Sequence, residues 1–69
     1  MRNEEVVTLI EQYGYLHGDH YSFNTREFLQ WSAQSGEPVS SEEAERLLQP
    51  FCRAMGHGEE GILWRHYIR

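Results

Sequence analysis

The feature that most constrains this chain is a single cysteine, Cys52, in a polypeptide of only 69 residues. One cysteine cannot form an internal disulfide, and a chain of this length buries only about 60% of the surface that it exposes when unfolded. We therefore expect one domain over residues 1–69, stabilised by apolar packing, by a partner or by self-association. The aromatic content of 13% is sufficient for a small core. We expect most of that core to come from Phe23, Phe28, Trp31, Phe51 and Trp64.

Charge excludes one class of function. The chain has 6 basic side chains, all arginine, against 11 acidic ones, for a net charge of -5. A coat of basic residues for nucleic acid is excluded by this sign. The charge is also uneven, because residues 1–52 carry three Arg against nine acids, or -6, whereas residues 53–69 carry three Arg against two Glu, or +1. This division predicts an acidic body with a small basic patch at the C-terminal end.

Apolar residues do not form a long run anywhere in the chain. The longest stretches, near Val6 and near Ile62, fall far short of the roughly 20 apolar residues of a spanning helix. The first five residues are acidic and lack the apolar region of a signal peptide. We expect a soluble cytoplasmic protein without a membrane partner.

The N-terminal part predicts a helix followed by a turn and a strand. Asn3 is the expected N-cap of a helix that runs to about Tyr13, with Val6, Leu9 and Ile10 on one face and Gly14 just after its end. Gly18-Asp19 then marks a turn, and the alternating Tyr21 and Phe23 indicate a short strand.

Two further helices follow. Asn24 and Glu27 have the spacing of a capping box for a helix that Gly36 ends, and Ser40 with Glu43 repeats that signal for a third helix. Apolar residues keep a helical period through Pro50 to Phe51 and Met55, so the third helix either kinks at Pro50 or ends near Gln49 and restarts.

The C-terminal part predicts a turn and a strand. Residues 56–61 contain three glycines and predict a flexible turn. Residues 62–68 alternate as a β-strand, with Ile62, Trp64 and His66 on one face. To satisfy its backbone, this strand must pair with residues 21–23, with residues near 51–55, or with a second copy of the chain.

This order of elements resembles a winged helix-turn-helix. The segment Phe28-Leu29-Gln30-Trp31-Ser32-Ala33-Gln34-Ser35-Gly36 is similar to a second helix with its turn glycine. The segment from Ala44 to Phe51, the Gly-rich loop and Trp64-Arg65-His66-Tyr67 resemble the third helix, the wing and the closing strand. The resemblance covers residues 24–69 and implies an α+β fold, a small winged-helix-like domain of three helices, a short strand and a C-terminal β-strand. The connection over residues 36–40 is longer than in a compact helix-turn-helix.

The third helix determines what the resemblance implies about function. Family members that bind DNA place base-reading residues there, whereas this helix opens with Glu42 and Glu43 and adds Glu45, with Arg46 as its one basic residue before Pro50. Carboxylates repel phosphates at close range. Many winged helices instead bind proteins or dimerise, and this charge pattern favours that role.

Reactive side chains are few. His17, Asp19 and His20 are close in sequence, with Cys52, His57 and His66 as further candidate ligands, but the chain lacks the paired ligands typical of zinc sites. Solvated loop histidines are the commoner case, and we expect neither a metal nor a cofactor. Cys52 is expected to be a small buried apolar residue. With no nucleophile, phosphate-loop or metalloprotease motif, we expect no catalytic residues and no enzyme activity.

The leading hypothesis is a small non-catalytic protein-binding module, a regulator or inhibitor of the kind found in phages and plasmids, that acts through an aromatic and acidic surface. Its partner would be a basic protein or a second copy of the chain. The alternative for the tyrosines is a place at the rim of the core. The residues expected to bind the partner are Tyr13, Tyr15, Tyr21, Tyr67, Glu42, Glu43 and Glu45.

The alternative function is that of a winged-helix DNA-binding transcriptional regulator. Four arginines are the candidate phosphate contacts: Arg46, Arg53, Arg65 and Arg69. A metal-binding domain built on His17 and His20 is a third and less favoured hypothesis.

Overall fold

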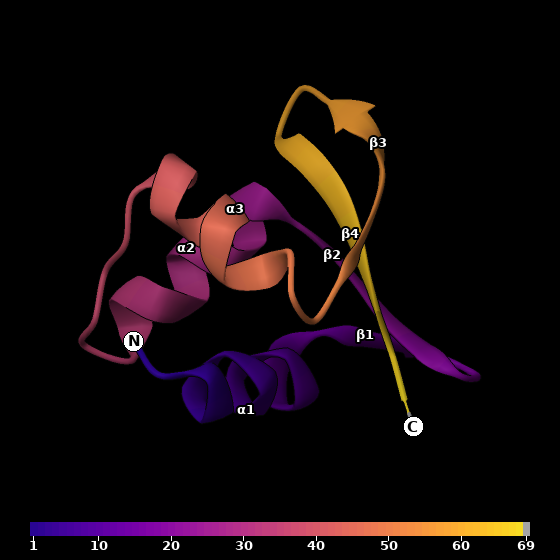
Figure 1. The fold of residues 1–69 in the computed structure, drawn as a ribbon, viewed down its shortest axis with the longest axis horizontal. Coiled ribbons are helices and arrows are strands. Elements are labelled where there is room, and N and C mark those ends of the chain that lie inside the picture. Colours follow the sequence, from indigo (N-terminus) through magenta and orange to yellow (C-terminus); the bar gives the residue numbers. More distant parts are fainter. Residues whose placement is uncertain (69) are drawn as a thin grey trace.

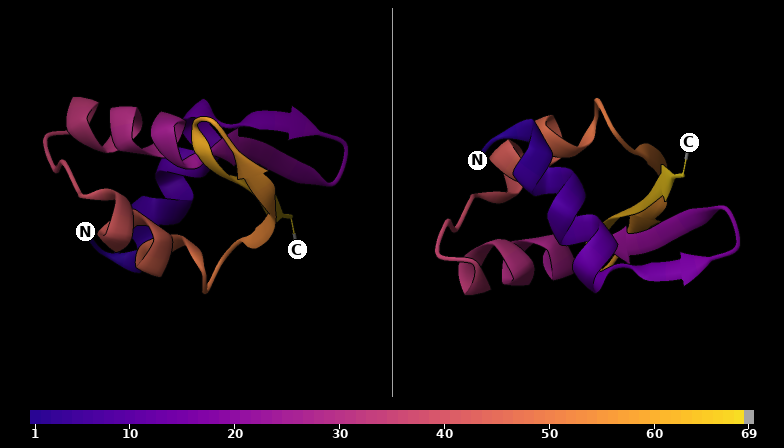
Figure 2. Two further views of the ribbon diagram at one scale, coloured as in Figure 1. Left: turned by 90° about the horizontal axis from the view of Figure 1, so that it is seen from above. Right: turned by 90° about the horizontal axis from the view of Figure 1, so that it is seen from below.

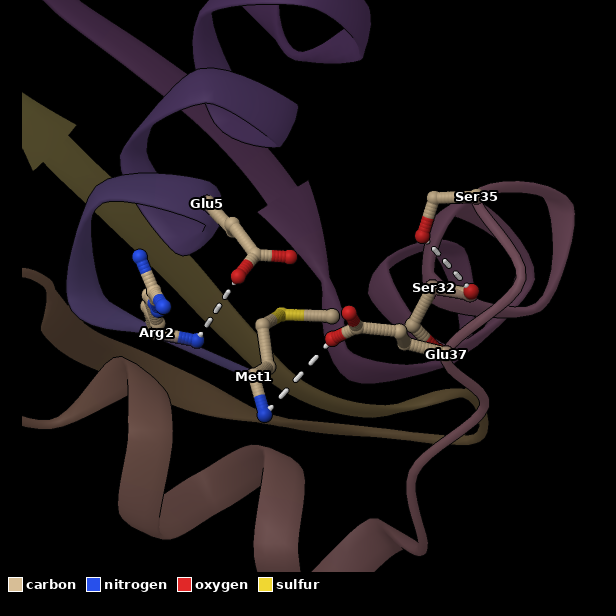
Figure 3. Close-up of polar contacts among 6 residues, drawn as sticks. All are labelled: Met1, Arg2, Glu5, Ser32, Ser35 and Glu37. Atoms are coloured by element: carbon tan, nitrogen blue, oxygen red, sulfur yellow. Dashed lines mark hydrogen bonds and ion pairs between the residues drawn. The ribbon is translucent and has the colours of Figure 1, made fainter.

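The computed structural model describes residues 1–68. Its N-terminal helix, α1, spans Asn3–Tyr13, as expected (Figure 1). Val6 and Ile10 face the core and are fully buried. The expected cap is wrong by one position, because Asn3 is already helical and the extended residue before it, Arg2, is the N-cap. The Glu5 side chain accepts a hydrogen bond from the Arg2 backbone N–H at 3.3 Å (Figure 3).

A β-hairpin follows α1. Strands β1 (Tyr15–His17) and β2 (His20–Asn24) pair antiparallel across the two-residue turn Gly18-Asp19, where Gly18 has a φ of 63°. A positive φ at this position is typical of the tight turns that join antiparallel strands. The expected turn and strand are confirmed, and β1 is an additional strand.

Helix α2 spans Thr25–Gln34 and has the expected capping box. The Glu27 N–H donates to Asn24 Oδ1 at 2.8 Å, and the Asn24 N–H donates to Glu27 Oε1 at 3.0 Å. The chain then turns at Gly36, with a φ of 89°. The long connection that follows is held to the N-terminus, because the Met1 amine lies 3.6 Å from a carboxylate oxygen of Glu37 (Figure 3).

Helix α3 spans Ser41–Leu48 and begins as expected, with Ser40 Oγ accepting from the Glu43 N–H at 3.2 Å. The predicted end near Gln49 is confirmed, since Gln49 is the C-cap, but the helix neither kinks at Pro50 nor restarts after it. The helix ends before Pro50, and the N–H groups of Phe51 and Cys52 bond to the Leu48 carbonyl at 3.0 and 2.8 Å in a closing turn. Proline has no N–H to continue the ladder, and the chain leaves α3 in extended form, so Met55 is not helical.

Strands β3 (Arg53–Gly58) and β4 (Gly61–Tyr67) form a second hairpin. The predicted flexible turn over residues 56–61 is therefore wrong: its first three residues belong to β3, and only Glu59 and Glu60 form the turn. The four strands have the order β1-β2-β4-β3, with antiparallel neighbours throughout. Strand β4 pairs on both sides, so it has no free edge for a second copy, and β1 and β3 are the edge strands.

The three helices gather on one side of the molecule, and the β1–β2 hairpin projects away from them (Figure 2). A hydrogen bond of 2.9 Å from Trp64 Nε1 to Thr25 Oγ1 ties β4 to the start of α2 within the core. The radius of gyration of 10.8 Å matches the roughly 11 Å of a compact chain of this length. A small α+β domain is confirmed, with more strands than expected, whereas Phe51 lies only half-buried at the rim. The buried apolar residues are Val6, Leu9, Ile10, Phe23, Phe28, Trp31, Ala44, Leu48 and Trp64.

Candidate binding surface

The sheet has one face that the core does not use. Phe23 and Trp64 lie opposite each other on β2 and β4 and are buried against the helices. Because successive side chains of a strand point to opposite faces, their neighbours in sequence point away from the core. We call this second face the outer face. Its members are Tyr15, His17, His20, Ser22, Asn24, Arg53, Gly56, Leu63, Arg65 and Tyr67.

Exposed apolar groups distinguish the outer face from an ordinary solvated sheet surface. The exposed fractions are 60% for Tyr15, 45% for Leu63 and 40% for Tyr67. Tyr67 belongs to a row of rings that crosses three strands: its ring centroid lies 5.3 Å from that of His20, and His20 lies 5.7 Å from His17. The outer face therefore offers rigid rings and an aliphatic side chain to a ligand.

A carboxylate lies at the tip of this row. Asp19 Oδ1 is 2.9 Å from His20 Nδ1, and this hydrogen bond is the main reason that the pKa of the exposed Asp19 carboxyl is lowered. The bond orients the His20 ring within the row.

Two arginines lie side by side on the outer face. Arg53 of β3 is directly opposite Arg65 of β4, and we call them the arginine pair. Within residues 1–68 neither guanidinium has a carboxylate oxygen within 4.0 Å, and Arg65 instead donates to the Tyr67 hydroxyl at 3.3 Å. Like charges in directly opposed positions of a sheet are destabilising. Within residues 1–68 the pair thus lacks a direct ion-pair partner, although, besides the hydrogen bond from His20, the charge of Arg65 contributes to the lowered pKa of Asp19.

A β-bulge creates the arginine pair. From the turn, the register runs His57 to Ile62 and Gly56 to Leu63, and then shifts by one so that Ala54 is opposite Trp64. Met55 is the extra residue. A regular ladder would have placed Arg53 opposite His66, on the core side, so the bulge turns the Arg53 side chain to the outer face.

A groove of about 610 Å³ lies where β3 begins. Its walls are Val7 and Glu11 of α1, residues 50–53 after α3, and residues 65–68 at the end of β4, so it includes the arginine pair. Glu11 is the one carboxylate among these lining residues. The groove therefore lies between α1 and the adjoining ends of β3 and β4, next to the arginine pair.

Contacts of His66 connect the end of β4 to the segment after α3 and to β2. His66 Nδ1 lies 2.7 Å from the Phe51 carbonyl oxygen, and its ring stacks on Tyr21 at 6.5 Å. Burial raises the pKa of the neighbouring Cys52 thiol to about 12. Because the thiolate is the nucleophilic form, a thiol that stays protonated at neutral pH is poorly suited to catalysis.

A separate acidic surface lies on the helical side. A depression of about 290 Å³ is lined by Glu45 of α3 and by Glu59 and Glu60 of the β3–β4 turn, together with Arg26. Glu60 lies 3.8 Å from the Arg26 guanidinium and accepts a hydrogen bond of 3.0 Å from Asn24 Nδ2. The predicted acidic residues Glu42 and Glu43 lie in the first turn of the same helix, α3.

The predicted tyrosine surface is thus only partly assembled. Tyr15 and Tyr67 share the outer face, but Tyr13 stacks on Trp31 with centroids 5.9 Å apart, and Tyr21 is half-buried on the core side. For Tyr21, the alternative of a place at the core rim is the correct one. The acidic residues of α3 do not share the outer face with the two remaining tyrosines.

The predicted arginines also separate. Arg53 and Arg65 meet, whereas Arg46 is exposed on α3 and Arg69 lies outside the described residues. The expected placement of Leu63 on one strand face with Arg65 and Tyr67 is confirmed, but Leu63, His17 and His20 were not among the predicted binding residues. Alternation along the C-terminal strand signalled Leu63, since it falls on the opposite face from Trp64.

Three further findings concern metal binding, membrane spanning and similarity to known proteins. In the described part of the chain, no group of three or more His, Cys, Asp or Glu side chains has an arrangement that could hold a metal ion. None of the helices in residues 1–68 combines the length and the apolar character needed to cross a membrane. Comparison with protein-family models, curated proteins and solved structures gives no match.

Proposed function

We propose that this protein is a small non-catalytic module that binds a protein partner through the outer face of its sheet. The observation that carries the proposal is the group of exposed apolar side chains on that face, Tyr15, Leu63 and Tyr67, each at least 40% exposed. Partly exposed aromatic residues beside arginine are typical of the centres of protein interfaces. The acidic depression on the helical side would steer the approach of a basic region of the same partner.

A winged-helix arrangement is part of the proposal. The chain order helix, strand, helix, helix and a closing hairpin supports it, with the β3–β4 hairpin in the place of the wing and β1 as an addition. Carboxylates in the first turn of α3 favour a protein ligand over duplex DNA, because that turn would otherwise approach phosphates.

Affinity capture with variants of the outer face tests this function. The tagged protein would be compared with Tyr15→Ala, Leu63→Ser and the matched control Leu16→Ser. Leu16 is 56% exposed and lies on the same hairpin, but its register partner is Tyr21, on the core side. We expect specific partners to be lost with the first two variants and kept with the control. Equal capture by all forms contradicts the proposal.

Duplex DNA binding is the second candidate, and the arginine pair is the observation that favours it. Its test is the binding of random duplex DNA as a function of salt. A steep loss of affinity with rising salt, which Arg53→Gln makes shallower, would support the DNA-binding regulator over the protein-binding module.

A further inference from the structure

Strand β3 has a bare outer edge. It is the last strand in the order β1-β2-β4-β3, and all six of its residues are exposed. Edge strands of stable monomers are usually protected by Lys, Pro, covering loops or bulges. Here the bulge at Met55 is accompanied by the small residues Ala54, Gly56 and Gly58. Within residues 1–68, β3 has β4 as its one strand partner, and its other edge has no backbone hydrogen bond to another segment, so a further strand could pair there.

The arginine pair lies at the end of a row of register partners that runs across the sheet to the edge of β3. Tyr15, Ser22, Arg65 and Arg53 occupy successive positions of one row across all four strands. The next position of this row would belong to a strand added beside β3. Directly opposed side chains have Cβ atoms about 4.5–5.5 Å apart, so an acidic side chain there would lie within reach of the Arg53 guanidinium. It would also offset the repulsion between the two arginines.

The neighbouring row of register partners indicates which second side chain an added strand should carry. Gly56 is opposite Leu63 on the outer face, and a Cβ added at Gly56 would meet no atom within 4 Å. An added strand could therefore place an apolar side chain over Gly56 and against the exposed Leu63. Arg53 and Gly56 are three positions apart on β3, because Met55 is the bulge residue. A ligand strand that skips Met55, as β4 does, fits the two rows with an acidic and an apolar residue two positions apart on one side.

We propose that the partner contributes an extended acidic segment that adds as a fifth strand to the edge of β3, with a carboxylate on the arginine pair and an apolar side chain on Leu63. This inference rests on the proposed function, since it names the kind of protein segment that the outer face binds. The open backbone edge favours a polypeptide over a single-stranded nucleic acid, because only a polypeptide can continue the hydrogen-bond ladder. Strand addition of this kind takes its affinity from the main chain and its specificity from alternate side chains.

The probe is a fluorescein-labelled peptide of about ten residues with the repeat Glu-Thr-Val-Thr, which places Glu and Val two positions apart on one side of an extended strand. It is titrated to about 1 mM at about 150 mM salt, where the Debye length is about 8 Å and the overall negative charge of the protein is screened. Amide resonances of the labelled protein report the site. We expect the largest shifts in residues 53–58. Arg53→Gln should weaken binding by about tenfold, because charge-assisted hydrogen bonds to Arg53 are lost.

Two matched controls separate strand addition from simple charge attraction. Arg46→Gln removes the same charge from an exposed site on α3 and should change the affinity by less than about twofold, since distant exposed charges are screened. A peptide with N-methyl groups on alternate residues has the same side chains but loses backbone donors, and it should not bind. Thermal melts of both protein variants verify that they are folded.

The inference is overturned if the peptide does not shift β3, if both arginine variants weaken it equally, or if the N-methylated peptide binds as well. Preferential binding of oligothymidylate, or a dimer in sedimentation whose formation shifts the same amides, would also overturn it in favour of nucleic acid or a second copy. The two proposals can fail separately. If the peptide does not bind but partner capture still depends on Tyr15 and Leu63, the strand-addition inference is wrong and the proposed function stands.

Discussion

The Thr25 hydroxyl serves two partners in the core. It accepts from Trp64 Nε1 at 2.9 Å and donates to the Ile62 carbonyl at 3.4 Å, with 4% of the residue exposed. Thr25→Val keeps the shape but orphans the indole N–H, which costs about 1–3 kcal/mol. A domain of this size loses about 4–8 °C in Tm per kcal/mol, which a thermal melt detects. Thr25→Ser, which retains the hydroxyl, should melt higher than Thr25→Val, and the reverse order would contradict the role of this bond.

Cys52 should make the free energy of unfolding depend on pH in the alkaline range. Desolvation raises the pKa of its thiol from 9.0 to about 12 in the folded protein. Between these values the unfolded chain releases a proton that the folded chain retains, so the free energy of unfolding falls as the pH rises above 9. Cys52→Ala should lose less stability between pH 8 and pH 10.5 in denaturant titrations, with the tyrosines titrating in both proteins. Rapid reaction of native Cys52 with a disulfide reagent at pH 7 would contradict this assignment.

Strand β3 shows where local sequence signals stop being sufficient at the scale of elements. The helices α1, α2 and the start of α3 were predictable, because capping residues such as Asn24 and Ser40 act within a few positions. Residues 53–58 contain two glycines and an alanine, which have low intrinsic strand propensity. They form a strand because β4 provides a partner, a non-local contact that overrides propensity. The helical spacing of apolar residues also led to the prediction that Phe51 and Met55 are helical.

The β3–β4 turn depends on the backbone conformation of Gly61. Its φ is 93°, and an added Cβ would lie 3.0 Å from the Thr25 Cβ. Gly61→Ala should therefore destabilise the protein by about 1–3 kcal/mol through backbone strain, with a further cost from the contact. Gly56→Ala is the matched control, because a Cβ there meets open space. Chemical denaturation measures both variants, and equal stability of the two would show that the turn tolerates a side chain.

For the molecule as a whole, the charge asymmetry was visible in the sequence, but its arrangement was not. Arg53 and Arg65 become neighbours only through the β3–β4 pairing, and only because the bulge at Met55 shifts the register. In the same way, Glu45 and Glu60 line one depression on the helical side, although they lie far apart in the sequence. The sequence predicted residues of the site one by one, and non-local pairing decided which of them meet.

The arginine pair should cost the protein stability, which is expected of a site retained for binding. Arg53→Gln relieves the repulsion between opposed like charges, but it also makes the net charge more negative. Arg46→Gln makes the same change in net charge at an exposed position on α3. Because Arg46 also lies in the last turn of α3, where a cation is favourable, the local effect is isolated by repeating the comparison in an Arg65→Gln background. With Arg65 present, the advantage of Arg53→Gln over Arg46→Gln should be larger than in that background by about 0.2–1 kcal/mol. Since this repulsion is screened by salt, the difference in thermal melts should shrink at about 1 M NaCl. A lower Tm for Arg53→Gln than for Arg46→Gln at low salt would mean that Arg53 is held by favourable contacts within the chain, and that the groove has no unsatisfied cation to offer a ligand.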